Sequence, residues 1–487
     1  MKKLKIYLLF LTIIYLLLII PIPSGGELNL AGAEQFIWNK DSLWNLLENN
    51  FDKYRNTDCI NLENQIDSSL EQLNSRLTNI SSGQYDPINL VFEKLLHDIF
   101  YTAPLIGACP DSSSAFLTLI DDMRSIVKEK SVEWDIDDKN VKSLLYKIIY
   151  GGRAAAEEII LQSEDESHFS NFNKFYELSL TPSTTFMGVK IHSGDILVSR
   201  GGAPTSALIA RGSDYPGNFS HAALVYVDPE TNIPFILESH IEMGVTVSTL
   251  EEYINDKKLR IMHLRIRNDL LELKNDQMLP HKAAKIMKDR ADKEHIAYDF
   301  EMDYNNDDKL FCSEVVSSAY GKFNINLWER ESTISSQGTA DLLKEFGVRY
   351  FRTQEPSDIE FDTQLKVNAE WRDLETLYQD HVDNAAVDAI LEWVDYGNSI
   401  PSNYLILPIY RIVKLYSTIL NLFNLVGPIP EGMSAEAALK HESYSTLHLD
   451  VKTHILKKAE VFKVEKDYRP PYWRLVEFGN DFFNNIY

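Results

Sequence analysis

Cysteine and basic side chains are scarce in this sequence. The 487 residues include three cysteines, and 48 Lys and Arg face 72 Asp and Glu, which gives a formal net charge of −24. No basic stripe reverses this excess locally, so a phosphate backbone would be repelled and nucleic-acid binding is excluded. The same charge disfavours electrostatic docking on an anionic membrane surface.

Long apolar runs are also scarce, and we find no internal repeat or low-complexity tract. The N-terminal apolar run, Ile6–Ile20, follows three lysines and is shorter than the roughly 20 residues of a spanning helix. Ala31-Gly32-Ala33 has the small-x-small form of a cleavage site, although it lies far from the run. We therefore predict that residues 1–33 are a signal peptide or an uncleaved signal anchor, and that residues 6–22 can attach the chain to a membrane. The rest of the chain would then be periplasmic or otherwise extracytoplasmic.

Export makes the few cysteines informative. Cys59 and Cys109 both lie in the N-terminal third, where a disulfide can form in an oxidising compartment. Cys312 is left over. Such a cysteine is buried and inert, paired with another chain, or reactive.

Hydrophobic periodicity divides the rest of the chain into three parts. Apolar residues at three- and four-residue spacing predict a helical domain over residues 34–175, with an acidic linker at Ser163–Ser167. Short β-type runs followed by helices predict an α+β unit over residues 180–350. Residues 351–487 form a mixed C-terminal extension that packs on this unit. The expected strands are 194–199, 222–227, 235–238, 245–247 and 259–266, and the expected helices include 280–293, 312–320 and 385–394.

The extension contains a long apolar segment, Leu405–Val426, with two interpretations. Its few polar residues form a stripe at helical spacing and leave a wide apolar face. One interpretation is a buried helix that covers the α+β unit. The other is a helix that lies against a membrane surface or lipid.

Three titratable residues stand at the edges of the expected α+β elements. Cys312 begins a helix, where the dipole and free backbone N–H groups stabilise a thiolate and can hold an oxyanion. His221 opens a strand and Glu238 closes an apolar run. Such a histidine can take the thiol proton, and a carboxylate can fix its tautomer. Each also has an ordinary structural explanation, and spacing alone does not show that the three meet.

The order of these motifs resembles a known family. The permuted papain-like amidases of the YaeF/YiiX type, in the NlpC-like cysteine peptidase superfamily, place histidine and its polar partner before the nucleophile. The resemblance spans residues 190–325 and rests on these motifs: Gly194-Asp195-Ile196-Leu197, Ser220-His221-Ala222-Ala223-Leu224-Val225, Glu238, Tyr298-Asp299-Phe300 and Phe311-Cys312-Ser313-Glu314-Val315-Val316.

The resemblance implies a circularly permuted papain-like core in which Cys312 is the nucleophile, His221 the base and Glu238 its orienting partner. Asp195, Tyr298 and Asp299 belong to the matched motifs and are candidate substrate-binding residues. The implied activity is a cysteine hydrolase that cleaves amide bonds through a thioester, on cell-wall peptides. The alternatives are a lipid amide or ester hydrolase or acyltransferase, and a non-catalytic envelope scaffold that retains the fold. No cofactor is expected.

One metal motif overlaps the nucleophile. Asp303, Asn305, Asp307 and Glu314 occupy positions one, three, five and twelve of a calcium loop of the EF-hand type. Position six is Asp308, where the sharp turn requires glycine, so we interpret the segment as a solvated acidic loop and expect no metal site.

Overall fold

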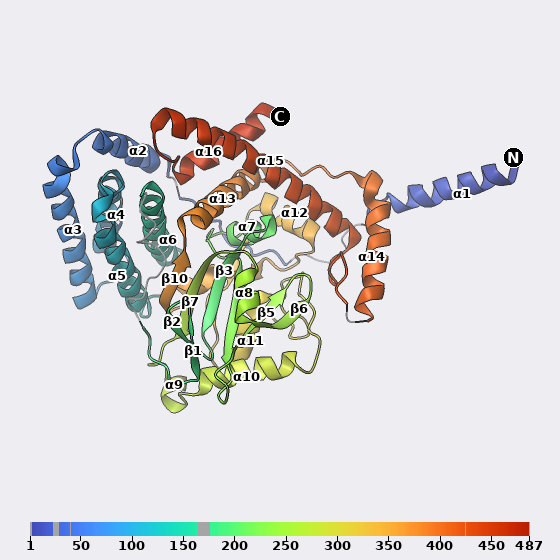
Figure 1. Cartoon of the computed structure of the whole chain (residues 1–487), viewed down its shortest axis with the longest axis horizontal. Helices are drawn as coiled ribbons and strands as arrows, with labels where there is room; N and C mark the ends of the chain where they lie inside the picture. The colour runs from blue at the N-terminus through green and yellow to red at the C-terminus, as the bar shows by residue number, and fades with distance from the viewer. Residues whose placement is uncertain (1, 23–28, 39, 164–175, 424, 487) are drawn as a thin grey trace.

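The N-terminal third of the chain is helical in the computed structural model, which describes residues 2–22, 29–38, 40–163, 176–423 and 425–486 (Figure 1). The predicted helical character of the N-terminal region is confirmed. Helices α3 and α4 begin where Asp58 and Asn89 accept hydrogen bonds from backbone N–H groups of the first turn. The helices are α1 (Lys2–Leu18), α2 (Asp41–Arg55), α3 (Cys59–Ser82), α4 (Leu90–Ala108), α5 (Ser113–Ser131) and α6 (Lys139–Gln162).

A disulfide joins two of these helices. Cys59 is the first residue of α3 and Cys109 follows the last residue of α4, and the two form a disulfide with a Cα–Cα distance of 5.8 Å. Helix α1 extends away from the body (Figure 1). Among the helices described here, none has both the length and the apolar character required to cross a bilayer. The linker predicted at Ser163–Ser167 lies, beyond Ser163, outside the described residues.

An antiparallel sheet forms the centre of the α+β unit, in the strand order β10-β7-β3-β4-β5-β6. Its strands are β3 (Ile196–Gly201), β4 (His221–Val227), β5 (Pro234–His240), β6 (Gly244–Thr249), β7 (Lys258–Ile266) and β10 (Leu365–Arg372). Two small pairs accompany it: β1 (Ser183–Phe186) with β2 (Val189–His192), and β8 (Ser332–Thr333) with β9 (Arg352–Thr353).

Both faces of the sheet are covered because its strands are apolar on alternate sides. Ala222 and Leu224 face a core that includes Val315 and Val316 of α11, whereas Ala223 belongs to the core of the opposite face. The helices of this unit are α7 (Pro204–Arg211), α8 (Leu250–Asn255), α9 (Leu271–Asn275), α10 (Leu279–Ala291), α11 (Cys312–Gly321) and α12 (Gln337–Phe346). The predicted α+β class is confirmed.

The sheet does not end where the sequence pattern does. Strand β10 pairs with β7 from Leu365↔Ile266 to Arg372↔Arg260, although it lies in the segment assigned to the C-terminal extension. Beyond it, α13 (Leu374–Asp395), α14 (Leu407–Asn421), α15 (Ala435–Lys466) and α16 (Tyr472–Ile486) complete the chain. Helices α13, α15 and α16 share a core with α7 and α12.

Buried ion pairs connect all three parts of the chain. Arg260 on β7 contacts Glu157 on α6 at 2.5 Å and Asp380 on α13 at 2.6 Å. Arg200 on β3 also pairs with Asp380, at 3.1 Å. These side chains are almost wholly excluded from solvent. Removal of one partner would leave an uncompensated buried charge, which costs about 3–5 kcal/mol.

Candidate active site

His221 and Glu238 meet on adjacent strands. His221 is the first residue of β4, and the register Ala223↔Glu238 brings the carboxylate of β5 onto the same face. His221 Nε2 lies 2.8 Å from Glu238 Oε2. Because a carboxylate only accepts hydrogen bonds, Nε2 carries the proton of the neutral ring. Nδ1 is then left with a free lone pair and can act as a base.

His240 is a second partner of the same carboxylate, which the sequence analysis did not identify. Its Nε2 lies 3.2 Å from Glu238 Oε1, and its ring centroid is 5.6 Å from that of His221. The available signal was the two-residue spacing of Glu238 and His240, which places both on one face of a strand. Glu238 therefore bridges two imidazoles.

The three groups of this cluster have different proton affinities. Burial raises the pKa of Glu238, but hydrogen bonds from both histidines outweigh it, and the net pKa is lowered so that the carboxylate is ionised. Burial lowers the pKa of His221 despite its bond to Glu238, which favours a neutral ring at pH 7. For His240 the hydrogen bond and charge of Glu238 outweigh burial, and its pKa is raised.

Cys312 lies beside the start of β4. It is the first residue of α11, and its Sγ is 4.0 Å from the carbonyl O of Ser220. A backbone hydrogen bond from Ala222 also acts on this sulfur. The thiol is therefore placed against both chain neighbours of His221.

Burial affects the charge state of this thiol. Cys312 is 4% exposed, and burial raises its pKa to about 11, although backbone N–H groups of Ala222 and Ser313 oppose the shift. The helix terminus was expected to stabilise a thiolate. Burial acts against that stabilisation, because the cost of desolvating the anion exceeds what the first turn of α11 provides.

Two further ionisable groups border the thiol. Tyr298 is close enough to Cys312 for their charges to interact, and its pKa is raised, chiefly by burial. Glu355 raises the pKa of Cys312, and burial raises the pKa of Glu355 itself to about 8. Its Oε2 has no hydrogen-bond partner within the described part of the chain. The sequence around Glu355 does not distinguish it from a surface carboxylate.

Asp195 and Asp299 have other environments. Asp195 is buried within the sheet, where its oxygens accept from His263 at 2.6 Å and from Arg265 at 2.7 and 2.8 Å. Asp299 accepts hydrogen bonds from backbone N–H groups of Glu301 and Asp303 and orders that loop. Of the three candidate substrate-binding residues, Asp195 and Asp299 are thus engaged in holding the fold, unlike Tyr298.

The acidic side chains of the loop before α11 are not arranged as a calcium site. Glu314 Oε2 accepts a hydrogen bond from the backbone N–H of Phe311 at 2.7 Å and caps its own helix. Among the described residues, no group of three or more His, Cys, Asp or Glu side chains is arranged to hold a metal ion.

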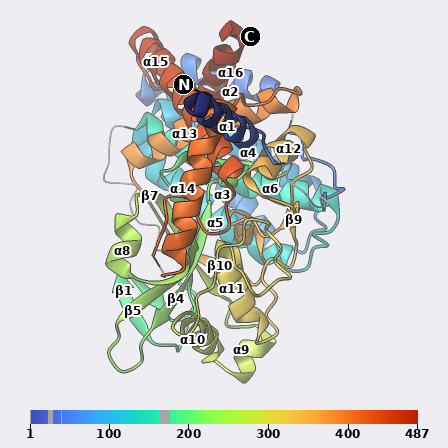
Figure 2. The same ribbon diagram turned by 90° about the vertical axis from the view of Figure 1, so that its right-hand side faces the viewer.

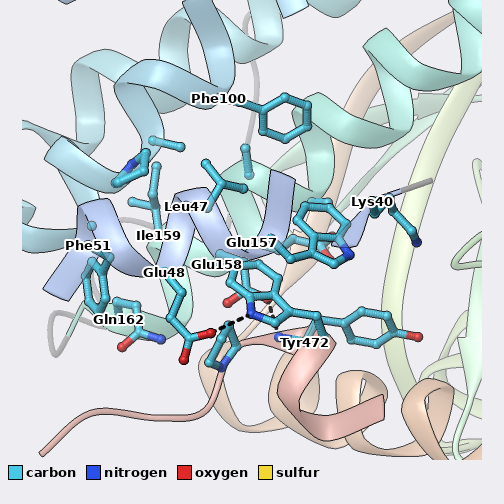
Figure 3. A pocket seen from close by; sticks show the side chains of 18 of the residues that line it. Lys40, Leu47, Glu48, Phe51, Phe100, Glu157, Glu158, Ile159, Gln162 and Tyr472 are labelled. Carbon is cyan, nitrogen blue, oxygen red and sulfur yellow. Dashed lines mark hydrogen bonds between the residues drawn. The ribbon is translucent and has the colours of Figure 1, made fainter. Parts of the chain in front are cut away.

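A separate apolar cavity of about 100 Å³ lies between the N-terminal helices and α16 (Figure 3). Glu157 and Glu158 are among the residues that line it, and none of these residues belongs to the cluster around Cys312. Its aromatic lining includes Trp38, Trp44, Phe51, Phe100, Tyr472 and Trp473. This apolar cavity is therefore distinct from the candidate active site.

The comparison with protein-family models agrees with the motif resemblance. The model of the family described as permuted papain-like amidase enzyme, YaeF/YiiX, C92 family, matches residues 190–356. The matched residues include His221, Glu238, Cys312 and Glu355. The predicted family is confirmed.

Solved structures that are similar include a crystal structure described as metalloprotein YiiX from Escherichia coli O157:H7. It is 20% identical, with a TM-score of 0.29, and the match covers 36% of this chain and 94% of that chain. No curated protein matches the chain.

Proposed function

We propose that the chain is a cysteine hydrolase that cleaves an amide bond through a thioester, with Cys312 as nucleophile, His221 as base and Glu238 as its orienting partner. The observation that carries the proposal is the 2.8 Å bond between His221 Nε2 and Glu238 Oε2, with the thiol of Cys312 against the residues that flank His221. The papain-like amidase family supports the reaction class.

The raised thiol pKa and the lowered imidazole pKa favour a neutral resting pair. As Cys312 Sγ bonds to the carbonyl carbon, its proton passes to His221 Nδ1, and backbone N–H groups at the start of α11 stabilise the oxyanion. His221 then gives this proton to the departing amine nitrogen as the C–N bond breaks, which leaves a thioester. Water, deprotonated by His221, attacks the thioester carbon, and the C–S bond breaks to release the acid and restore the thiol.

Two acyl groups fit this chemistry. Peptides of the cell wall are the substrate that the family resemblance suggests. A lipid amide or ester is favoured by a separate observation, the exposed apolar face of α14, and an acyltransferase would pass the same thioester to an acceptor other than water. Export of the chain and its attachment through residues 6–22 remain predictions.

The test is to incubate the wild type and the Cys312→Ala variant with isolated envelope peptides and, separately, with extracted envelope lipids, and to compare products by mass spectrometry. The proposal expects products that need Cys312 and that fall strongly with Glu238→Gln. If products form only from the peptides, or only from the lipids, that result identifies the acyl group of the substrate. Equal product patterns for wild type and Cys312→Ala in every fraction would favour the non-catalytic scaffold, for which the burial of the thiol is the supporting observation.

A further inference from the structure

Helix α14 has one face that is firmly held to the protein. Tyr410 and Val413 pack against apolar side chains of the segment 429–433. Lys414 Nζ donates to two backbone carbonyls of this segment at 2.7 and 2.8 Å, and Ser417 Oγ accepts from one of its backbone N–H groups at 3.0 Å. These contacts fix the rotation of the helix, so its opposite face cannot turn inward.

That opposite face is apolar and uncovered. The exposed fractions of its large side chains range from 47% to 78%, and their spacing of three and four residues forms a stripe along the helix. Single exposed aliphatic residues are ordinary, but a contiguous face of this kind marks an interaction surface. We define the α14 outer face as Ile409, Ile412, Leu415, Tyr416, Ile419 and Leu422.

A second apolar element lies beside this face. Tyr15 Oη of α1 donates to the carbonyl O of Leu405 at 2.8 Å, and Arg411 donates to the carbonyl O of Ile20 at 2.8 Å. The described side chains of Ile6–Leu17 are largely exposed as well. Figures 1 and 2 show α1 next to α14 at one end of the molecule, away from the sheet.

We propose that the α14 outer face, together with α1, docks on the boundary between headgroups and hydrocarbon of a lipid bilayer. Arg411 pairs with Glu436, and Lys414 is engaged with backbone carbonyls, so the charged side chains of α14 are held against the protein. The outer face is dominated by Ile and Leu, whereas protein interfaces are enriched in Tyr, Trp and Arg. It lies beside α1, which is apolar after its three lysines except for Thr12. An apolar face on a helix whose charged side chains point the other way is typical of an interfacial amphipathic helix.

The net charge decides which bilayer suits this surface. With 72 acidic and 48 basic side chains, the protein as a whole is repelled by anionic headgroups despite the three lysines at the start of α1, so apolar burial must supply most of the attraction. Binding to neutral vesicles is therefore expected, with little dependence on salt. The segment 429–433 that holds α14 also packs on Ile241 and Phe300, which neighbour His240 and Tyr298. A docked α14 would thus be in contact, through this segment, with the surroundings of the candidate active site.

The experiment is flotation of the full chain with phosphatidylcholine vesicles at low and high salt. We expect wild-type protein to float with the vesicles. The affinity of the double variant Ile412→Asn with Ile419→Asn for the vesicles should be at least about tenfold lower. Val461→Asn with Val464→Asn, on the exposed side of α15, is the matched control and should bind as the wild type does. Circular dichroism melting checks that both variants are folded.

Three outcomes would overturn the proposal: no flotation of the wild type, equal flotation of the α14 variant, or equal loss in the α15 control. Light scattering after gel filtration adds a fourth. A dimer of the wild type that dissociates in the α14 variant, without vesicle binding, would assign the face to a second copy of the chain. Flotation needs no catalysis, so this result is independent of the fate of the proposed hydrolase.

Discussion

Alkylation of Cys312 reports directly on the electrostatics of the candidate active site. Relative to an ordinary thiol with a pKa of 9.0, the pKa of Cys312 is raised to about 11. Two pKa units reduce the thiolate fraction at pH 7 about 100-fold. The more basic thiolate is intrinsically more nucleophilic, which recovers about tenfold. The balance is a labelling rate about tenfold slower than that of a free thiol, and the 4% exposure of the side chain slows it further.

The assay is a time course with iodoacetamide at pH values from 6 to 11, followed by mass spectrometry of the peptide that contains Cys312. Cys59 and Cys109 are disulfide-bonded, so without reductant the label reports on Cys312, and a Cys312→Ser variant gives the background. Urea-unfolded protein supplies the free-thiol rate. Labelling of the folded protein that is faster than this rate at pH 7, or an inflection well below pH 9, would refute a neutral, buried thiol.

Three other perturbations test the surroundings. His240→Gln should raise the pKa of His221, since the charge of His240 opposes protonation of that ring; an NMR titration that shows no upward shift would contradict this. Glu355→Gln should raise stability by a few kcal/mol at pH 8 but not at pH 4, because burial raises the pKa of Glu355 to about 8 and the folded wild type retains a proton that the unfolded chain releases; urea unfolding at both pH values tests the sign. Loss of the disulfide between Cys59 and Cys109, which are 50 residues apart, should lower the free energy of unfolding by about 4 kcal/mol, and an unchanged denaturation midpoint for the double serine variant would argue against the link.

Local patterns were sufficient for the elements that carry the site. The turn-bounded apolar runs predicted β4 and β5, and the sequence from Cys312 onward predicted α11, whose bounds are Cys312–Gly321. These features depend on neighbours in the chain. The order of motifs then supplied the family, which the match over residues 190–356 confirms.

Features that depend on distant segments were not predictable. Strand β10 was missed because its partner β7 lies about a hundred residues earlier, and nothing local marks the pairing. Burial of Cys312 and Glu355 depends on packing of separate elements, so neither their proton affinities nor their proximity could be derived from spacing. His240 was not identified from the sequence, although its two-residue offset from Glu238 places it beside the carboxylate.

The sheet edge and its buried ion pairs make residues 190–356 depend on the rest of the chain. A fragment limited to residues 190–356 would lack β10, leave the backbone of β7 open at the sheet edge, and strip Arg260 of both Glu157 and Asp380. An exposed edge strand invites aggregation, and an unpaired buried guanidinium is destabilising. Residues 190–356 therefore depend on both flanking regions for a stable fold, and deletion of either region is expected to impair folding directly.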